Sequence, residues 1–419
     1  MKVLIFSQYF WPESFGINAL ALSLKRRGAE VTVLTGKPNY PEGSIFKGYS
    51  ALGMHHERYE GMDILRCPLL PRGRRSSVLL FLNYISFIVA GLVYGSKSLR
   101  GRSFDVVFVY APSPLLQALP AIWLAHLKKA PLALWVQDLW PESLSATGSV
   151  KNRLLLKLVE RAVRFIYRHT DLILIPSEAF RRPIEKLTKG AGAIRYYPNA
   201  WIEESAQEEP DATLEALSRR IASGFSVLFA GNLGTAQSLE TVIAAAELLQ
   251  ETGSDVRFFL IGSGSMSEWL AEQINAKGLR NVETPGRFPS AAMPRLYAGA
   301  SALLVSLRDE PIFALTVPSK LQGYLAAGKP VIAALNGEGA RVVTAAGAGI
   351  ACAAGEPEAL AKAVQSLAQL GPEALGHMGA SARRYAVAHF SLDALTTEAM
   401  QHFEDLAATH STNKGKKHR

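Results

Sequence analysis

The sequence predicts an α/β protein built from two Rossmann-like domains that face a cleft. Its 419 residues suit two domains, each large enough to bury a full sheet. Short apolar or β-branched runs alternate with helical patterns, which is typical of parallel strands joined by crossover helices. This series starts afresh after a break near residue 200. Because ligands of open parallel sheets bind beyond the carboxyl ends of the strands, we expect one site between the two domains.

The first domain is predicted to span residues 1–200. Its expected strands are, in order, residues 2–7, 30–35, 105–110, 132–137 and 172–176. The first of these runs follows a single lysine and lacks a small-residue cleavage site, so we interpret it as a buried strand rather than a secretory signal. The segment 196–201 carries turn-forming residues and leads into an acidic, polar stretch, which is the composition of a linker.

The second domain is predicted to span residues 201–385. Its expected strands are residues 226–230, 256–261, 282–285, 302–306 and 330–333. The pattern after Gly355 is helical, and we expect a terminal helix at 386–410 to return to the first domain. A basic tail follows at 411–419.

Composition restricts the class of protein. The two cysteines, Cys67 and Cys352, lie far apart without metal-ligand neighbours, so neither a disulfide framework nor a zinc site is implied, and a reducing cytoplasm fits. A net charge of +9 suits nucleic acid, an anionic membrane or a polyphosphate ligand.

The distribution of charge favours a membrane surface over nucleic acid. Residues 78–94 form an uncharged run of roughly 26 Å as a helix, shorter than the ~20 residues of a comfortable span. A buried helix, an interfacial or re-entrant contact and a true span remain open, although strands on both sides argue against a span. A stretch at 151–168 has the pattern of a basic amphipathic helix, with a solvated helix face as the alternative. The basic residues concerned are Arg72, Arg74, Arg75, Lys97, Arg100 and Arg102 around the apolar run, and Lys157, Arg161, Arg164 and Arg168 in the second stretch.

Two glycine turns follow consecutive strands of the second domain. The first contains Gly231, Asn232 and Gly234, and the second contains Gly262 and Gly264. Glycines between a strand and a helix let backbone N–H groups approach a phosphate at the positive end of the helix. The alternative is a pair of plain tight turns.

A longer motif narrows the prediction. Residues 305–313 read Val-Ser-Leu-Arg-Asp-Glu-Pro-Ile-Phe, and residues 318–333 read Pro-Ser-Lys-Leu-Gln-Gly-Tyr-Leu-Ala-Ala-Gly-Lys-Pro-Val-Ile-Ala. This pattern resembles the donor site of glycosyltransferase family 4, which has the GT-B fold. Residues 138–143, Asp-Leu-Trp-Pro-Glu-Ser, resemble a signature of its WbuB and colanic acid type branch. The resemblance covers nearly the whole chain.

This resemblance implies an activity. A retaining glycosyltransferase would move a hexosyl or N-acetylhexosaminyl group from a nucleotide diphosphate sugar to a lipid-linked saccharide, in the synthesis of O-antigen, capsule or exopolysaccharide. The enzyme would be cytoplasmic and peripheral at the cytoplasmic face of the inner membrane, with no cofactor and no nucleic acid partner. The chain contains no Asp-x-Asp motif, so no metal-bridged diphosphate is expected.

The resemblance also implies donor-site residues. Asn232 and Gln237 stand where the family has a basic pair, so another cation must meet the diphosphate. Lys320, beside Ser319 at a predicted helix start, is our first choice, with a solvated helix-end lysine as the alternative. Gly323 stands where the family has a ribose-binding glutamate. The remaining donor-site candidates are Arg287, Arg308, Gly231, Gly234, Gly262, Gly264 and, toward the transferred sugar, Glu310.

In the first domain the resemblance points to strand-end loops. Gly16 and Asn18 would face the donor phosphates and the acceptor. Asp138 would stabilise positive charge, orient the acceptor hydroxyl or accept its proton, unless it only caps a helix or bonds within its loop. Ser113 and Glu142 complete the expected acceptor side.

Two other functions are compatible with the sequence. A nucleotide-sugar 2-epimerase has the same fold and no second sugar, so it needs no membrane segment. A catalytically silent subunit of a polysaccharide assembly fits the absent glutamate at Gly323 and the absent basic pair.

Overall fold

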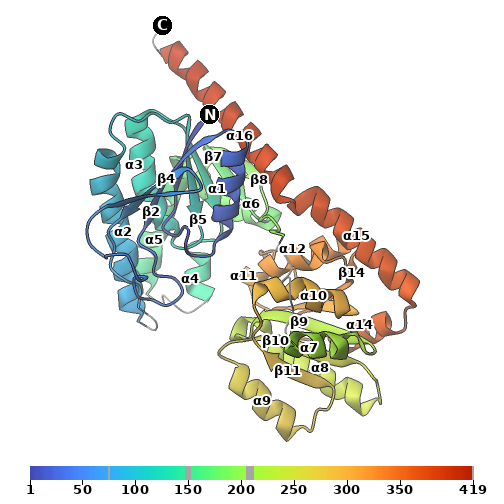
Figure 1. The fold of residues 1–419 in the computed structure, drawn as a ribbon. Coiled ribbons are helices and arrows are strands. Elements are labelled where there is room, and N and C mark those ends of the chain that lie inside the picture. The colour runs from blue at the N-terminus through green and yellow to red at the C-terminus, as the bar shows by residue number, and fades with distance from the viewer. Residues whose placement is uncertain (74–75, 147–151, 204–211, 418–419) are drawn as a thin grey trace. The chain divides into compact units, whose positions relative to one another are not determined.

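Figure 1 shows a computed structural model of the chain, which describes residues 1–419 except 74–75, 147–151, 204–211 and 418–419. Arg74, Arg75 and the start of the predicted stretch at 151 therefore lie outside the described residues. The chain forms two compact units. The first comprises Met1–Pro198 together with Leu392–Arg419, and the second comprises Asn199–Ser391.

The first unit is built on an eight-stranded sheet in the order β3-β4-β2-β1-β5-β6-β7-β8. All its pairings are parallel except that of β3 with β4. Apart from the exposed Lys2 at the start of β1, the central strands β1, β5 and β6 are buried apolar runs, as expected for a parallel sheet covered on both faces. The strands are β1 (Lys2–Phe6), β2 (Glu30–Gly36), β3 (His55–Tyr59), β4 (Met62–Cys67), β5 (Val106–Ala111), β6 (Leu132–Val136), β7 (Leu172–Ile175) and β8 (Ala193–Tyr196).

Helices of the first unit cover this sheet. They are α1 (Gly16–Arg26), α2 (Ser77–Ser98), α3 (Ala118–Lys128), α4 (Glu142–Ala146), α5 (Arg153–Arg168), α6 (Arg181–Thr188) and the terminal α16 (Leu392–Lys417). α16 returns to this unit and packs on α1. Its Phe403 ring lies 4.9 Å from that of Phe108 on β5, and its Thr396 hydroxyl donates to the Ser23 hydroxyl at 2.9 Å. The returning helix thus starts at Leu392 rather than at 386.

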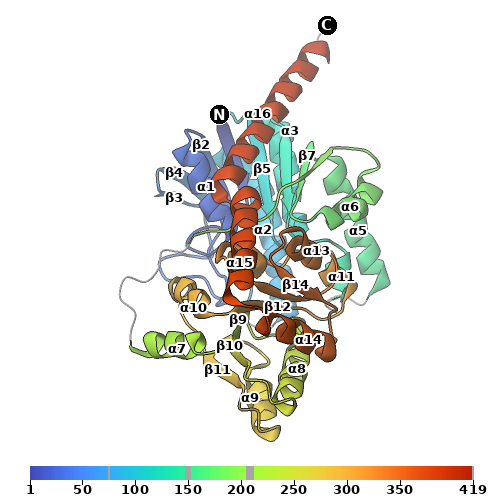
Figure 2. The same ribbon diagram turned by 90° about the vertical axis from the view of Figure 1, so that its right-hand side faces the viewer.

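The second unit has a six-stranded parallel sheet in the order β11-β10-β9-β12-β13-β14 (Figure 2). The strands are β9 (Ser226–Asn232), β10 (Arg257–Ser263), β11 (Val282–Gly286), β12 (Ala302–Ser306), β13 (Val331–Ala334) and β14 (Gly349–Cys352). The helices are α7 (Ala212–Ala222), α8 (Leu239–Glu251), α9 (Ser267–Ala276), α10 (Met293–Gly299), α11 (Pro311–Ala314), α12 (Ser319–Ala326), α13 (Glu338–Ala345), α14 (Pro357–Ala368) and α15 (Pro372–Phe390).

Each face of this second sheet carries its own apolar core. Leu228 and Leu303 point to one face, where α7, α10, α12 and α15 pack. Val227 and Phe229 point to the other face, where α8, α9 and α14 pack. The alternation of side chains along β9 therefore serves two helix layers at once.

Helix α2 contains the apolar run predicted at 78–94. It is long and apolar enough to cross a membrane by length and composition, with a mean hydropathy of 2.0, and a third of its most apolar window is buried. Phe87, Ile88 and Ala90 are buried, whereas Val78, Phe81 and Val89 are more than half exposed. The buried-helix interpretation describes one side of α2, and the other side is an exposed apolar surface.

Candidate functional site

The two predicted glycine turns lie side by side at the carboxyl end of the second sheet. β9 and β10 run in register there, so that Gly231 is opposite Gly262 and Asn232 is opposite Ser263. Gly231 and Gly262 have φ values of 142° and 144°, a conformation in which side chains are strained. A Cβ on Gly262 would lie only 1.8 Å from the carbonyl oxygen of Gly231. Glycine is thus required for these two turns to touch.

A cavity of about 530 Å³ lies in front of these turns, and we call it the glycine-turn cavity. Its wall includes the backbone of both turns and, across from them, Arg287, Phe288, Met293 and Tyr297. Four predicted donor residues therefore meet in one place, namely Gly231, Asn232, Gly262 and Arg287. The volume falls within the ~300–1,000 Å³ typical of small-molecule sites.

Lys320 supplies a cation next to this cavity. It is the second residue of α12, and its Nζ donates to Gln237 Oε1 at 2.7 Å and lies 3.7 Å from the centre of the Phe229 ring. A Cβ on Gly231 would lie 3.3 Å from this Nζ. Among the described residues no carboxylate pairs with it, and burial lowers the pKa of Lys320 to about 7. An ammonium that has lost its water without gaining a counter-charge favours an anionic ligand.

The neutral residues that stand in the predicted basic-pair positions support this cation. Gln237 lies in the short turn Thr235–Gln237, where its side chain accepts from Lys320 and its carbonyl accepts from Ser306 Oγ at 2.7 Å. The Asn232 side chain packs against the turns, because a Cβ on Gly234 or Gly264 would come within 2.7 Å of its amide. Ser319 is exposed at the first position of α12.

The other two charged candidates lie elsewhere on the loop after β12. Arg308 is exposed and forms an ion pair with Glu240 at 2.6 Å. Glu310 is exposed and precedes α11 as its N-cap residue. Neither lines the glycine-turn cavity. Of the three candidate cations, Lys320 and Arg287 are beside this cavity and Arg308 is engaged by a carboxylate.

In the first unit, Asp138 follows β6 and is held in one orientation. Its Oδ2 accepts from Ser143 Oγ at 3.0 Å and from Trp140 Nε1 at 3.2 Å. Burial raises the pKa of Asp138 above its ordinary value, against these hydrogen bonds, which lower it. The fully buried Tyr167 hydroxyl, which has no hydrogen-bond partner among the described residues, is close enough for Asp138 and Glu142 to raise its pKa. Glu142 itself is exposed at the start of α4.

In the loop after β1, the structure gives the surroundings of Gly16 and Asn18. Asn18 is committed within its own loop, because its Oδ1 accepts from the Trp11 N–H at 3.0 Å and its Nδ2 donates to the Glu13 carbonyl at 2.6 Å. A Cβ on Gly16 would meet no atom within 4 Å, so this chain does not itself require glycine there. Ser113 hydrogen bonds to Tyr84 of α2.

Glu13 is a buried carboxylate that the sequence did not reveal. It is 2 % exposed, and its carboxylate accepts from the backbone N–H groups of Asn39, Tyr40 and Phe10 at 2.8, 2.8 and 3.3 Å. Burial raises its pKa to about 7 although these three bonds favour the charged form. Glu13 thereby ties the loop after β1 to the loop after β2. Its only sequence signal is a glutamate within an aromatic, proline-containing loop.

Among the described residues, no group of three or more His, Cys, Asp or Glu side chains could hold a metal ion. The glycine-turn cavity combines backbone N–H groups, amide side chains and the cations Lys320 and Arg287, which suit a phosphate-bearing ligand.

Comparison with known families agrees with this geometry. Residues 16–200 match the family described as "Glycosyl transferase 4-like domain", and residues 224–369 match "Glycosyl transferases group 1". Together these matches cover more than three quarters of the chain. The chain belongs to the family 4 glycosyltransferases and has the GT-B fold.

Particular relatives extend this assignment. The chain is 28 % identical over 342 residues to the putative colanic acid biosynthesis glycosyl transferase WcaI of Escherichia coli (strain K12), covering 78 % of this chain and 82 % of WcaI. Among solved structures, sucrose-phosphate synthase of Thermosynechococcus elongatus superposes with a TM-score of 0.73 at 17 % identity, covering 97 % of this chain and 99 % of that one. Anabaena HepE in complex with UDP gives 0.66 at 14 % identity, covering 97 % and 100 %. At these identities the solved structures show the fold alone.

Proposed function

We propose that this protein is a retaining, metal-independent glycosyltransferase that moves a hexosyl or N-acetylhexosaminyl group from a nucleotide diphosphate sugar to a lipid-linked saccharide. Its pathway would be the synthesis of a cell-surface polysaccharide, such as O-antigen, capsule or exopolysaccharide. The family supports the class of reaction, and the name of WcaI, a colanic acid biosynthesis transferase, supports the class of product. The complex of HepE with UDP supports a nucleotide donor in this fold.

One observation carries the proposal, namely the desolvated Lys320 ammonium beside the paired glycine turns. Departure of a nucleoside diphosphate leaves new negative charge on its phosphate oxygens. A cation and backbone N–H groups that are fixed before the reaction stabilise such charge without reorganisation, which is the largest contribution to many enzymatic rates. Lys320 has no carboxylate partner among the described residues, so a phosphate that enters the site becomes the counter-ion of its protonated form.

Asp138 is the group that we assign to the acceptor. Ser143 and Trp140 donate to its Oδ2 and the Leu139 N–H also bonds the carboxylate, so three donors hold Asp138 in place, and a carboxylate has capacity for a further bond from an acceptor hydroxyl. Burial raises its pKa, so it is a stronger base than an exposed aspartate. We propose that it orients the acceptor hydroxyl and receives its proton.

We infer that the exposed apolar surface of the first unit contacts the membrane that holds a lipid-linked acceptor. Large apolar side chains are exposed on three helices, of which α3 contacts both α2 and α5. This apolar face consists of Val78, Leu79, Phe81, Leu82, Ile85, Val89, Leu92 and Val93 on α2, Trp123 and Leu127 on α3, and Leu154, Leu155, Leu158 and Phe165 on α5.

Basic residues lie beside the apolar face, and this combination of apolar and basic side chains suits binding to an anionic lipid surface. Lys157 and Arg161 interrupt the exposed leucines of α5, and Lys97 ends α2. We propose that the enzyme is cytoplasmic and lies peripherally on the inner membrane through this face. A transmembrane arrangement is disfavoured because Phe87 and Ile88 of α2 are buried within the folded unit.

The proposal is tested by incubating the protein with UDP-, GDP- and ADP-linked sugars and bacterial membrane lipid extracts. We expect sugar to enter the lipid fraction with the anomeric configuration of the donor, and activity to survive EDTA. Conversion of the donor sugar to its C2 epimer without an acceptor would identify an epimerase instead. Failure of every nucleotide sugar to raise the melting temperature would indicate a silent subunit.

A further inference from the structure

The helix α2 contributes to the apolar face on one side and carries a buried amide on the other. No residue of the segment 77–82 is buried, and Val78 and Phe81 are 67 % and 55 % exposed. Asn83 is the first buried side chain along the helix and has no exposure to solvent. A buried amide costs free energy unless its polar atoms are bonded. Asn83 is thus the point at which α2 enters the folded unit.

Asn83 joins α2 to three loops at the carboxyl ends of strands. Its Nδ2 donates to the Leu70 carbonyl, in the loop after β4, at 2.6 Å and to Asn39 Oδ1, in the loop after β2, at 3.3 Å. Its Oδ1 accepts from Gln8 Nε2, in the loop after β1, at 2.7 Å. The strands β4, β2 and β1 are neighbours in the sheet. One side chain of α2 therefore holds three adjacent strand-end loops together.

The partners of Asn83 lie in a dry interior. Gln8 and Asn39 have no exposure to solvent, so water cannot replace a bond that they lose. Gln8 Oε1 already has no hydrogen-bond partner among the described residues. Asn39 extends the contact, because its N–H donates at 2.8 Å to the Glu13 carboxylate, which also accepts from the Tyr40 N–H. A displacement of α2 at Asn83 would therefore disturb the loops after β1 and β2.

The next residue of α2 reaches a fourth loop. The half-buried Tyr84 hydrogen bonds through its hydroxyl to Ser113, in the loop after β5, and to Tyr9, in the loop after β1. Burial raises the pKa of Tyr84, and the negative charge of Asp138 adds to this rise, so the two side chains are within electrostatic reach of each other. Because β5 is the neighbour of β1, α2 contacts loops at the ends of four consecutive strands.

We propose that Asn83 and Tyr84 are positioning residues that couple membrane binding by α2 to the order of these loops, so that the enzyme is more active on a membrane than in solution. This inference rests on the proposed function, from which it takes the lipid contact of the apolar face and the role of Asp138. Lipid around Phe81 restrains the first turns of α2, which have no buried side chain of their own. The bonds of Asn83 and Tyr84 transmit this restraint to the loops and to the surroundings of Asp138.

Lipid meets the thermodynamic condition for such coupling. A ligand shifts a conformational equilibrium only when it binds one of the two states better. The surface that lipid contacts includes the segment 77–82, and the position of this segment is fixed by the bonds of Asn83. Lipid therefore favours the arrangement in which these bonds are made.

Hydrogen exchange with and without phosphatidylglycerol vesicles tests the coupling and needs no acceptor. With the protein saturated by vesicles, we expect exchange in segments 8–16 and 37–46 to slow about ten-fold, the scale of one hydrogen bond. Asn83→Leu should float with the vesicles as the unaltered protein does and show no such slowing. Unchanged exchange in both segments of the vesicle-bound unaltered protein overturns the inference. A full response in Asn83→Leu also overturns it, because lipid would then cover the loops directly.

Two further variants support the interpretation of this experiment. Ser86→Ala is the matched control, because the described hydrogen bonds of the Ser86 hydroxyl stay within α2 and the loop after β4. Its vesicle response should be normal, and a lost response would contradict a specific role of Asn83. Should Asn83→Leu fail to fold, Gln8→Met removes one partner instead, while the Gln8 N–H keeps its bond to Gln117. It should abolish the slowing in 8–16 and preserve that in 37–46, and equal slowing of both segments overturns the inference.

Activity separates this inference from the proposed function. With bacterial lipid extract in vesicles as acceptor, Tyr84→Phe should lower kcat about ten-fold and leave vesicle binding and nucleotide affinity unchanged. A normal kcat overturns the role of Tyr84. Transfer to lipid by a protein whose loops do not respond to vesicles overturns the inference alone. Failure of the unaltered protein to bind vesicles overturns the membrane contact of the proposed function with it.

Discussion

Replacing Lys320 with methionine should make the protein more stable and less able to bind a nucleoside diphosphate. Methionine has an apolar side chain of similar length but lacks the ammonium, whose Nζ lies over the Phe229 ring. The ammonium is costly in the free protein because it is buried without a carboxylate partner among the described residues. Because no described carboxylate neutralises the Lys320 ammonium, it is available to a phosphate. Stability and affinity should therefore change in opposite directions.

The pKa of Lys320 sets the magnitude. A pKa lowered from 10.5 to about 7 corresponds to about 5 kcal/mol of unfavourable free energy for the charged form in the folded state. In the Lys320→Met variant, loss of the hydrogen bond to Gln237 offsets about 1 kcal/mol of this gain in stability, and relaxation of the site around the charged lysine in the unaltered protein reduces the gain further. We expect Lys320→Met to raise the free energy of unfolding by about 2–4 kcal/mol at pH 7. We expect it to weaken binding of UDP, GDP or ADP about 100-fold.

The effect on stability has a defined pH dependence. Below pH 7 the lysine is protonated in both the folded and the unfolded chain, so its full cost is present. Between pH 7 and 10.5 the unfolded chain binds more protons, so the unaltered protein gains up to about 1.4 kcal/mol of stability per pH unit relative to Lys320→Met. The stability advantage of the variant should therefore shrink from pH 7 to pH 10.

Urea unfolding between pH 6 and pH 10 measures the stability, and isothermal titration calorimetry measures the affinity. Lys329→Met is the matched control, because Lys329 is also a partly buried lysine of this unit but lies outside the wall of the glycine-turn cavity. It should leave nucleotide affinity unchanged. A Lys320→Met protein that is less stable than the unaltered one and binds nucleotide normally would refute the assignment of Lys320 to the diphosphate.

Three further predictions concern other residues. Asp138→Asn should lower kcat for transfer to lipid-linked acceptor about 10²–10⁴-fold with unchanged nucleotide affinity, and full activity would exclude Asp138 as the base. The double change Phe81→Ser and Leu158→Ser should reduce flotation with phosphatidylglycerol vesicles while altering the free energy of unfolding by under about 1 kcal/mol, whereas Val387→Ser, exposed on α15, should float normally. Gly262→Ala should destabilise the second unit by more than about 3 kcal/mol in thermal unfolding, because its Cβ would overlap the Gly231 carbonyl; near-normal stability would show that the turns can separate.

The sequence was sufficient for most strands because parallel strands are continuous apolar runs. The β3–β4 hairpin was missed because β3, on the sheet edge, is the polar run His-His-Glu-Arg-Tyr, whose side chains are all partly or fully exposed. β14 was missed because Gly-Ile-Ala-Cys is short and begins with glycine, where a Cβ would lie 2.0 Å from the Val331 carbonyl. β4 carries Asp63 and Arg66 within its apolar run, and β8 was missed too, because it is a four-residue edge strand with one buried side chain.

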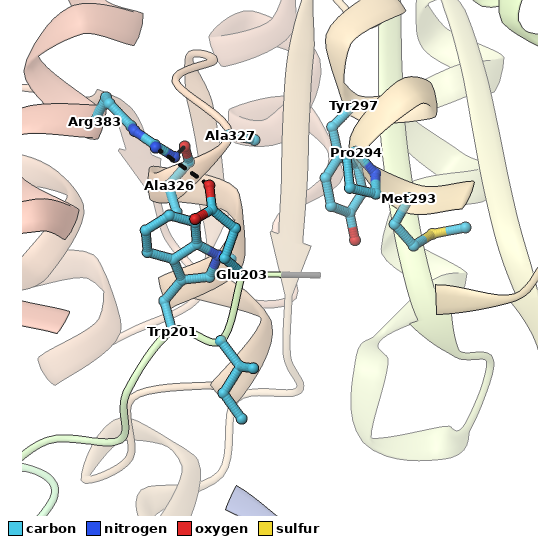
Figure 3. Close-up of a pocket in the computed structure, with 10 residues that line it drawn as sticks. Trp201, Glu203, Met293, Pro294, Tyr297, Ala326, Ala327 and Arg383 are labelled. Carbon is cyan, nitrogen blue, oxygen red and sulfur yellow. Dashed lines mark hydrogen bonds and ion pairs between the residues drawn. The ribbon is translucent and has the colours of Figure 1, made fainter. Parts of the chain in front are cut away.

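At the site, sequence motifs located the glycine turns and Lys320, because chain-local turns place them. They did not show that Glu240 neutralises Arg308, since these residues are 68 positions apart. They also did not reveal a second cavity of this unit, lined by Trp201, Tyr297 and Arg383 (Figure 3), whose wall is assembled from residues near 201, 295, 325 and 383. Contacts between distant segments depend on packing that no local pattern encodes.

The return of α16 has a consequence for synthesis of the protein. The first unit contains Met1–Pro198 but is completed only by Leu392–Arg419, whereas the second unit is one uninterrupted segment. During synthesis on the ribosome, about 190 intervening residues must be made before Phe403 can cover α1 and the β5 residue Phe108. The second unit can therefore fold before the first unit is complete. A chain stopped before Leu392 would carry a finished nucleotide domain attached to a half that exposes its apolar interior to proteases and chaperones.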